Sequence, residues 1–138
     1  MKPSEVAKAF GTAVAILVLN VLIAIVAVVV YSVFIEPGHS REFYDAAALR
    51  IAPWCSHIAG TALFFGAGYV FGRHRPARRG LVFAAAVTFF YAIVDSASVG
   101  FAGFFATEFA LSIAAKLAAS LAGTALAARI PADQRLRS

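Results

Sequence analysis

The feature that most constrains the fold is a long apolar run near the N-terminus. Residues 9–35 include no Asp, Glu, Lys or Arg. A bilayer core about 30 Å thick is crossed by about 20 helical residues, so this run is long enough to span it. It also exceeds the roughly 7–15 apolar residues of a cleavable signal sequence. We therefore expect a transmembrane helix here rather than a leader that is removed.

The composition extends this interpretation to the whole chain. The protein has 138 residues, of which 62% are hydrophobic and 14% are charged. Soluble domains carry about 45–50% apolar and about 25% charged residues, and a soluble protein of this length has little interior in which to bury the excess. Because lipid offers no hydrogen bonds, the backbone of each span must satisfy itself as a helix. We therefore predict one all-α integral membrane domain covering residues 1–138.

Three more apolar stretches follow the first, at about residues 51–72, 81–105 and 109–128. Each has about 20 residues or more, which is enough to cross a bilayer. The predicted fold is therefore an antiparallel bundle of four transmembrane helices. We expect Glu36-Pro37-Gly38 to end the first helix, and Ser40 to cap a separate short surface helix over about residues 41–50.

The basic residues are distributed unevenly between the two sides of this predicted bundle. Nine lie on the side of both termini and the second connection, only Arg41 and Arg50 lie on the other side, and Lys116 lies within a span. The positive-inside rule therefore predicts that both termini face the cytoplasm, most simply across a bacterial inner membrane. We expect the basic connection to contact anionic lipid headgroups rather than nucleic acid, through Arg73, Arg75, Arg78 and Arg79.

A short sequence similarity relates the second and fourth predicted spans. Residues 58–63 read IAGTAL and residues 121–126 read LAGTAL. Two tandem helical hairpins would explain the match, and chance similarity between alanine-rich helices is the alternative.

Two charged residues, Asp95 and Lys116, fall within predicted spans. A charge at the centre of a bilayer costs about 2.5–3.5 kcal/mol on insertion scales. Asp95 lies about 21 Å above the inner start of its span, and Lys116 lies about 12 Å below the outer start of the next span. In a core about 30 Å thick these depths agree to within about one helical turn, so we expect the two side chains to meet.

Other polar residues recur at spacings of three or four, which places them on single faces of their helices. If these faces converge, the bundle has a polar interior. Its predicted lining residues, which form the candidate ligand or ion pathway, are Asn20, His57, Thr61, Tyr91, Asp95, Ser98, Ser112, Lys116 and Ser120.

The leading functional interpretation is transport, or assistance in transport, of a small solute or ion through this interior. The alternative interpretation of the charged pair is structural: mutual neutralisation that fixes helix register. Two other functions stay open, an accessory or assembly subunit of a membrane complex and a lipid-handling membrane enzyme. In each case we expect a homo-oligomer or a partner membrane subunit, and the Gly68–Gly72 GxxxG spacing predicts close packing within the bundle or between subunits.

Several kinds of chemistry lack their usual motifs. The sequence has no phosphate-binding glycine loop, no HExxH zinc motif, and a single cysteine, Cys55. Only His57 is within a predicted span, whereas haem held between spans would need two histidines. We therefore predict no cofactor, no metal site and no catalytic residues, and an enzymatic activity is not favoured.

Overall fold

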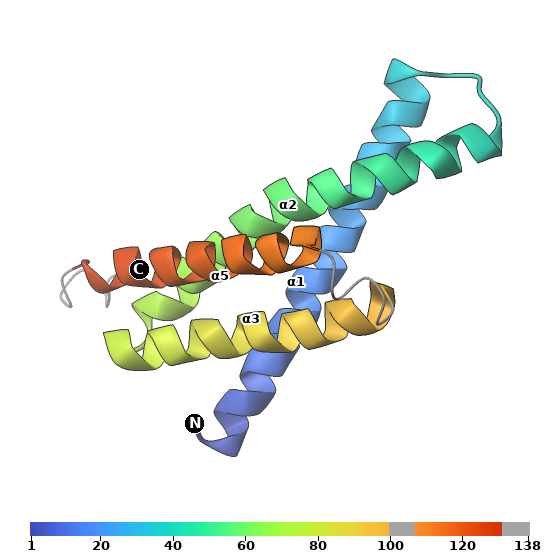
Figure 1. Cartoon of the computed structure of the whole chain (residues 1–138). Coiled ribbons are helices and arrows are strands. Elements are labelled where there is room, and N and C mark those ends of the chain that lie inside the picture. Colours follow the sequence, from blue (N-terminus) through green and yellow to red (C-terminus); the bar gives the residue numbers. More distant parts are fainter. Residues whose placement is uncertain (100–106, 131–138) are drawn as a thin grey trace.

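The computed structural model describes residues 1–99 and 107–130, and the side chains of residues 98 and 99 are not included in that description. The described part consists of helices joined by short turns (Figure 1). These elements are α1 (Pro3–Val30), which continues into a wider π-helical turn (Tyr31–Ile35), α2 (Arg41–Arg73), α3 (Ala77–Val99) and α5 (Thr107–Ala128). The prediction of an all-α chain is confirmed.

Among the described residues, three helical segments are long and apolar enough to cross a membrane, namely Pro3–Ile35, Ala77–Ala97 and Thr107–Ala128. The sequence-based expectation of four such helices is thus met for three of them, and α2 is not among these three. α2 is long enough, but Pro53, His57 and several glycines replace the aliphatic residues that fill α1. These residues partition into lipid less favourably than leucine or isoleucine do.

A separate surface helix over residues 41–50 is not found, because α2 runs continuously from Arg41 to Arg73. Its N-terminus is capped as expected, since the Ser40 hydroxyl accepts a hydrogen bond from the Phe43 backbone N–H at 3.4 Å. Pro53 lies inside the helix without ending it. A proline removes one backbone hydrogen bond, and the helix continues on both sides of it.

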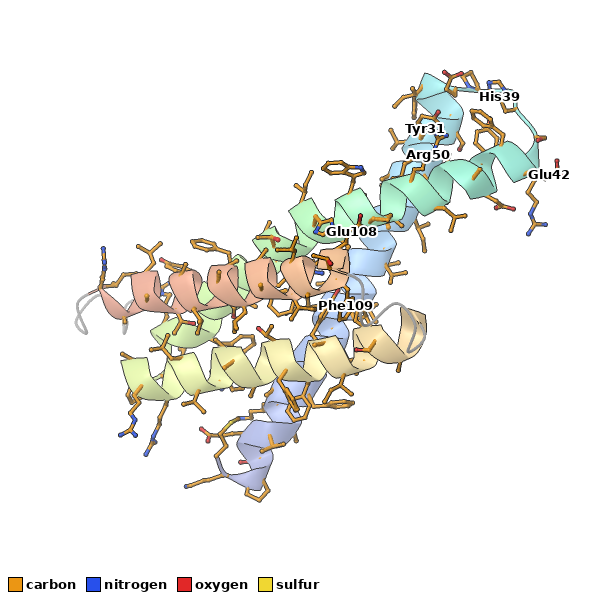
Figure 2. The ribbon with its side chains drawn as sticks, in the orientation of Figure 1. Tyr31, His39, Glu42, Arg50, Glu108 and Phe109 are labelled. Carbon is orange, nitrogen blue, oxygen red and sulfur yellow. The ribbon has the colours of Figure 1, made fainter. Side chains whose placement is uncertain are left out.

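The turn between α1 and α2 lies where Glu36-Pro37-Gly38 predicted a stop. The Glu36 N–H donates to the Tyr31 carbonyl at 2.9 Å, and Gly38 has a φ of +85°, a conformation that favours glycine. The Tyr44 hydroxyl donates to the Glu36 carbonyl at 2.7 Å and thereby ties the turn to α2. Figure 2 shows Tyr31, His39 and Glu42 grouped at the tip of this hairpin, away from Glu108 at the start of α5.

The other helix ends differ modestly from the predicted spans. α1 begins at Pro3 rather than near residue 9, and α3 begins at Ala77 rather than near residue 81. α5 begins at Thr107, two residues before the predicted start. The predicted end of the third span, residues 100–105, lies outside the described residues.

α2 and α5 form the closest helix pair, and they run in the same direction (Figure 1). A methyl group on Gly68 would overlap the backbone carbonyl of Ser120, and one on Gly123 would overlap the backbone carbonyl of Phe65. Gly72 continues the contact, because its added methyl group would lie 3.0 Å from the Thr124 Cα. The Gly68–Gly72 pair therefore packs within the chain, as small residues do in membrane-helix interfaces.

The two copies of the predicted repeat also meet at this interface. Gly60, from the first copy, faces Lys116 on α5, and Gly123, from the second copy, faces Phe65 and Tyr69 on α2. The tandem-hairpin origin remains a prediction.

α1 crosses the other helices obliquely (Figure 1). Small residues on its N-terminal half allow this close crossing, since Ala9 and Ala13 are fully buried. The apolar core lies where α1, α2 and α3 meet and consists of Ala9, Ala13, Ile16, Phe64, Phe83, Val87 and Tyr91. The polar residues described next lie beside this core.

Candidate functional site: a polar core around Lys116

The centre of the candidate site is Lys116, a lysine that is only 1% exposed. It belongs to a stripe on α5 in which every fourth residue is polar, and this spacing keeps the stripe on one face. Ser112, Lys116, Ser120 and Thr124 are all buried, whereas Glu108 at the start of the stripe is exposed. The stripe faces α2 and α3 rather than the surface of the bundle.

The Lys116 ammonium is bound by groups from three helices. Its Nζ donates hydrogen bonds to the hydroxyls of Ser56 on α2 and Ser112 on α5, both at 2.9 Å. It also lies 4.9 Å from the centre of the Tyr91 ring on α3. An ammonium this close to an aromatic ring is attracted to the negative face of the ring. The charge is therefore solvated by the protein rather than by water.

Gly60 provides the space that the lysine occupies. A methyl group at this position would lie 2.8 Å from Lys116 Cε and 3.4 Å from Asn20 Oδ1. Gly60 belongs to a stripe on α2 that also repeats every four residues and faces α5. The members of this stripe are Ser56, Gly60, Phe64, Gly68 and Gly72.

Tyr91 connects the lysine to residues on α1 and α3. Its ring packs edge-to-face against Phe64, with ring centres 5.0 Å apart. The Asn20 amide donates to the Tyr91 hydroxyl at 3.4 Å, and the same hydroxyl also interacts with Ser56 and Asp95. Tyr91 is 1% exposed, so these contacts are shielded from solvent.

Asn20 contributes an acceptor that the described residues leave unused. The residue is 7% exposed, and its Oδ1 is buried with no hydrogen-bond partner in the described part of the chain. An unsatisfied buried acceptor of this kind costs about 1–3 kcal/mol, so its presence needs an explanation.

Asp95 lies at the edge of the cluster, one helical turn beyond Tyr91 on α3. Its side chain is half-buried and interacts with Tyr91 and, electrostatically, with Lys116. The two charged residues of the spans are therefore neighbours, with Tyr91 contacting both. The resulting polar core, a term used below for these residues, consists of Asn20, Ser56, Tyr91, Asp95, Ser112 and Lys116.

The structure does not bring every predicted pathway residue into this core. His57 is half-buried, and its side chain makes no hydrogen bond to a described residue. Thr61 uses its hydroxyl on the His57 carbonyl of its own helix. Ser120 lies one turn further along α5, against Gly68, and the side chain of Ser98 is outside the described part.

Ser56 is the core residue that the sequence analysis missed. The sequence indicates the adjacent residue His57 instead, because its side chain is more polar, and His57 lies on a neighbouring face of the helix. The signal that identifies Ser56 is its four-residue spacing from Gly60, Phe64 and Gly68, because this spacing places it on the face that α5 contacts.

The four arginines of the α2–α3 connection divide into two pairs. The guanidinium carbon of Arg73 lies 5.7 Å from the centre of the Tyr69 ring, and that of Arg75 lies 3.9 Å from the centre of the Phe83 ring. Both guanidinium groups therefore pack against aromatic side chains of the protein. Arg78 and Arg79 are exposed, and they line a cavity of about 550 Å³ together with Lys2.

Chemically, the polar core holds a cation and a carboxylate in a water-poor environment. Electrostatic interactions are stronger there than in water, and small changes in one group affect its neighbours. Hydroxyl, amide and phenol groups surround the cation and the tyrosine beside it, and each can accept or donate a hydrogen bond, or both. Such an arrangement can fasten helices together, and it can also pass a proton between its members.

No protein family model matches the chain, and neither a curated protein nor a solved structure is detectably similar to it.

Proposed function

We propose that this chain is a small polytopic membrane protein that transports, or assists transport of, a proton or small ion, with the polar core as the binding site. The observation that carries the proposal is the burial of the Lys116 ammonium next to Asp95 among the helices. Ionisable residues inside membrane-spanning helices are rare and mark ion pathways or proton relays disproportionately often.

A proton fits the packing better than a larger solute. Lys116 has almost no accessible surface, and even an added methyl group at Gly60 would overlap it. A solute would have to separate the helices, whereas a proton moves in short steps between hydrogen-bonded groups. The contacts from Asp95 to Tyr91, and from Ser56 to Lys116, supply such groups.

We base the order of the relay on burial, and the side of access on the predicted depth of Asp95. Asp95 is half-buried, whereas Tyr91 and Lys116 are fully buried. In this proposal Asp95 exchanges protons with the outer side, and Lys116 is the inner member of the relay. Asn20 Oδ1 is a second acceptor for the ammonium when it leaves Ser56 or Ser112.

We also propose that α2 is the fourth membrane span, despite its lower apolar content. α2 and α5 run parallel and pack at Gly60, Gly68 and Gly72, so these parts of the two helices lie at the same depth. If α5 crosses the bilayer, α2 crosses it beside α5. Four crossings place both termini on one side, and the lysine and arginine distribution favours the cytoplasmic side of a bacterial inner membrane.

The transport proposal is tested by reconstituting the purified protein into vesicles that contain a pH-sensitive dye. An imposed membrane potential should drive proton uptake in the wild type, and Asp95→Asn and Lys116→Met should each reduce the rate at least tenfold. Asp45→Asn is the matched control, because it removes an acid that is exposed near the start of α2. Unchanged flux in both core variants at equal protein content, or no flux above empty vesicles, would contradict the proposal.

A further inference from the structure

A second charged site lies away from the polar core, between the N-terminal ends of α1 and α3. It is a cavity of about 550 Å³ lined chiefly by Lys2, Glu5, Arg78, Arg79, Val82 and Phe83. Volumes of this order are typical of small-molecule sites. Transport through the polar core makes no use of this cavity.

The cavity carries an excess of positive charge. Three of its lining side chains are cationic and one, Glu5, is acidic. The Glu5 carboxylate accepts a hydrogen bond from the Lys2 backbone N–H at 3.3 Å. This bond at the start of α1 partly satisfies the negative charge of Glu5. Within the described part of the chain, neither Arg78 nor Arg79 forms a salt bridge. Their guanidinium groups are available to an anion from outside the chain.

The guanidinium groups of Arg78 and Arg79 differ in this respect from that of the nearby Arg75. Arg75 donates to the Phe71 carbonyl at 3.2 Å and stacks on Phe83, so its guanidinium is held by the protein. Arg78 and Arg79 lie on α3 itself, one and two residues after its start at Ala77. Two cations with free donors therefore project at the end of a helix that is apolar enough to cross the membrane.

The remaining wall of the cavity is apolar. Phe83 is buried at 3% exposure and Val82 is 49% exposed. Both follow the arginines along α3, so they lie on the membrane side of the charged groups. The cavity thus has a cationic end at the expected depth of the headgroups and an apolar end at the expected depth of the acyl chains.

We infer that this cavity binds the phosphate headgroup of an anionic phospholipid. Arg78 and Arg79 donate hydrogen bonds to the phosphate oxygens, an interaction that the planar guanidinium makes with two donors at once. Lys2 adds a third cation from α1, and Val82 contacts the start of the lipid chains. A bound lipid would bridge α1 and α3 and stabilise their crossing. The inference depends on the membrane placement of α3 and is independent of the transport role.

A lipid is favoured over a soluble phosphate compound because of the apolar wall. A free phosphate would use the three cations alone, whereas a phospholipid also covers the exposed Val82 side chain. Basic residues near an anionic membrane surface contribute about 1 kcal/mol each, which corresponds to about fivefold in affinity.

The test is native mass spectrometry of the full chain, delipidated in a neutral detergent and titrated with phosphatidylglycerol or phosphatidylcholine. Phosphatidylglycerol should bind at least tenfold more tightly. Arg78→Gln combined with Arg79→Gln should weaken its binding about 25-fold and leave phosphatidylcholine unaffected. Lys2→Gln should weaken it about fivefold, which provides a second variant in a different helix if the double variant does not fold.

Arg129→Gln is the matched control, because Arg129 is an exposed arginine just after α5 and does not line the cavity. Its phosphatidylglycerol affinity should stay within twofold of the wild type. Equal affinity for the two lipids, or an equal loss in the control, would overturn the inference. Equal binding of glycerol phosphate and phosphatidylglycerol would assign the site to soluble phosphates and would also overturn it.

Discussion

The Lys116 ammonium lies 4.9 Å from the centre of the Tyr91 ring, and the same tyrosine also interacts with Asp95, one helical turn further along α3. One aromatic side chain therefore lies beside both of the charged residues that fall within predicted spans. The ring solvates the cation, and the hydroxyl solvates the carboxylate. This relationship, together with the hydroxyls of Ser56 and Ser112, explains how two charges remain among the helices.

Asp95 and Lys116 should be energetically coupled. Removing one of the two charges leaves the other without its counter-charge, whereas removing both costs less than the sum of the single changes. Asp95→Asn, Lys116→Met and the double variant should therefore give a coupling energy above about 0.5 kcal/mol. Reversible unfolding in mixed micelles, followed by circular dichroism, measures it. Additive effects would show that the two side chains do not act as a pair.

Gly60→Ala should destabilise the bundle by about 1–3 kcal/mol, because the new methyl group overpacks the lysine. It would lie 2.8 Å from Lys116 Cε. Gly66→Ala is the matched control on the same helix, since an added methyl group there has no described atom within 4 Å. The control should be neutral or stabilising by up to about 1 kcal/mol, because alanine favours helices.

The unfolding free energies of the two glycine variants provide the measurement. Equal effects would contradict the packing at Gly60. Combining Gly60→Ala with Lys116→Ala should be less harmful than the sum of the two single changes, because shortening the lysine makes room for the methyl group.

The topology makes a prediction that distinguishes three crossings from four. In a Cys55→Ala background, Ser40→Cys and Ala77→Cys should react with a membrane-impermeant maleimide from opposite sides of intact vesicles or cells. Both positions are exposed and lie near the two ends of α2. Labelling of both from the same side would show that α2 does not cross the membrane, and would also overturn the assignment of both termini to the cytoplasm.

Much of the polar core could be predicted from the sequence because helical spacing carries the information. The four-residue repeat on α5 identified Ser112 and Lys116, and the similar depths of Asp95 and Lys116 predicted their proximity. These inferences need only the rise and period of a helix. They do not depend on the crossing angle of the bundle.

Other features depended on packing that the sequence does not display. Ser56 lies in the core because Gly60 and Gly68 allow α2 to approach α5 closely, whereas the more polar His57 falls outside it. The continuity of α2 through Pro53 was likewise missed, since a proline suggests a boundary but permits a helix supported on both sides. The cavity at Lys2 arises from the oblique crossing of α1, which no local pattern indicates.

Asn20→Leu should separate function from stability. The variant loses one long hydrogen bond, Asn20 Nδ2 to the Tyr91 hydroxyl at 3.4 Å, and it also removes a buried acceptor with no described partner. Because leaving such an acceptor unsatisfied costs about as much as a hydrogen bond contributes, the free energy of unfolding should change by less than about 1 kcal/mol. Proton flux should nevertheless fall at least tenfold if Asn20 Oδ1 receives the Lys116 ammonium during the relay.

Val21→Leu, a change of similar size on the exposed face of α1, is the control and should leave both the free energy of unfolding and the proton flux unchanged. A stable variant with normal flux would remove Asn20 from the relay, and a loss of several kcal/mol would show that Asn20 fastens the helices.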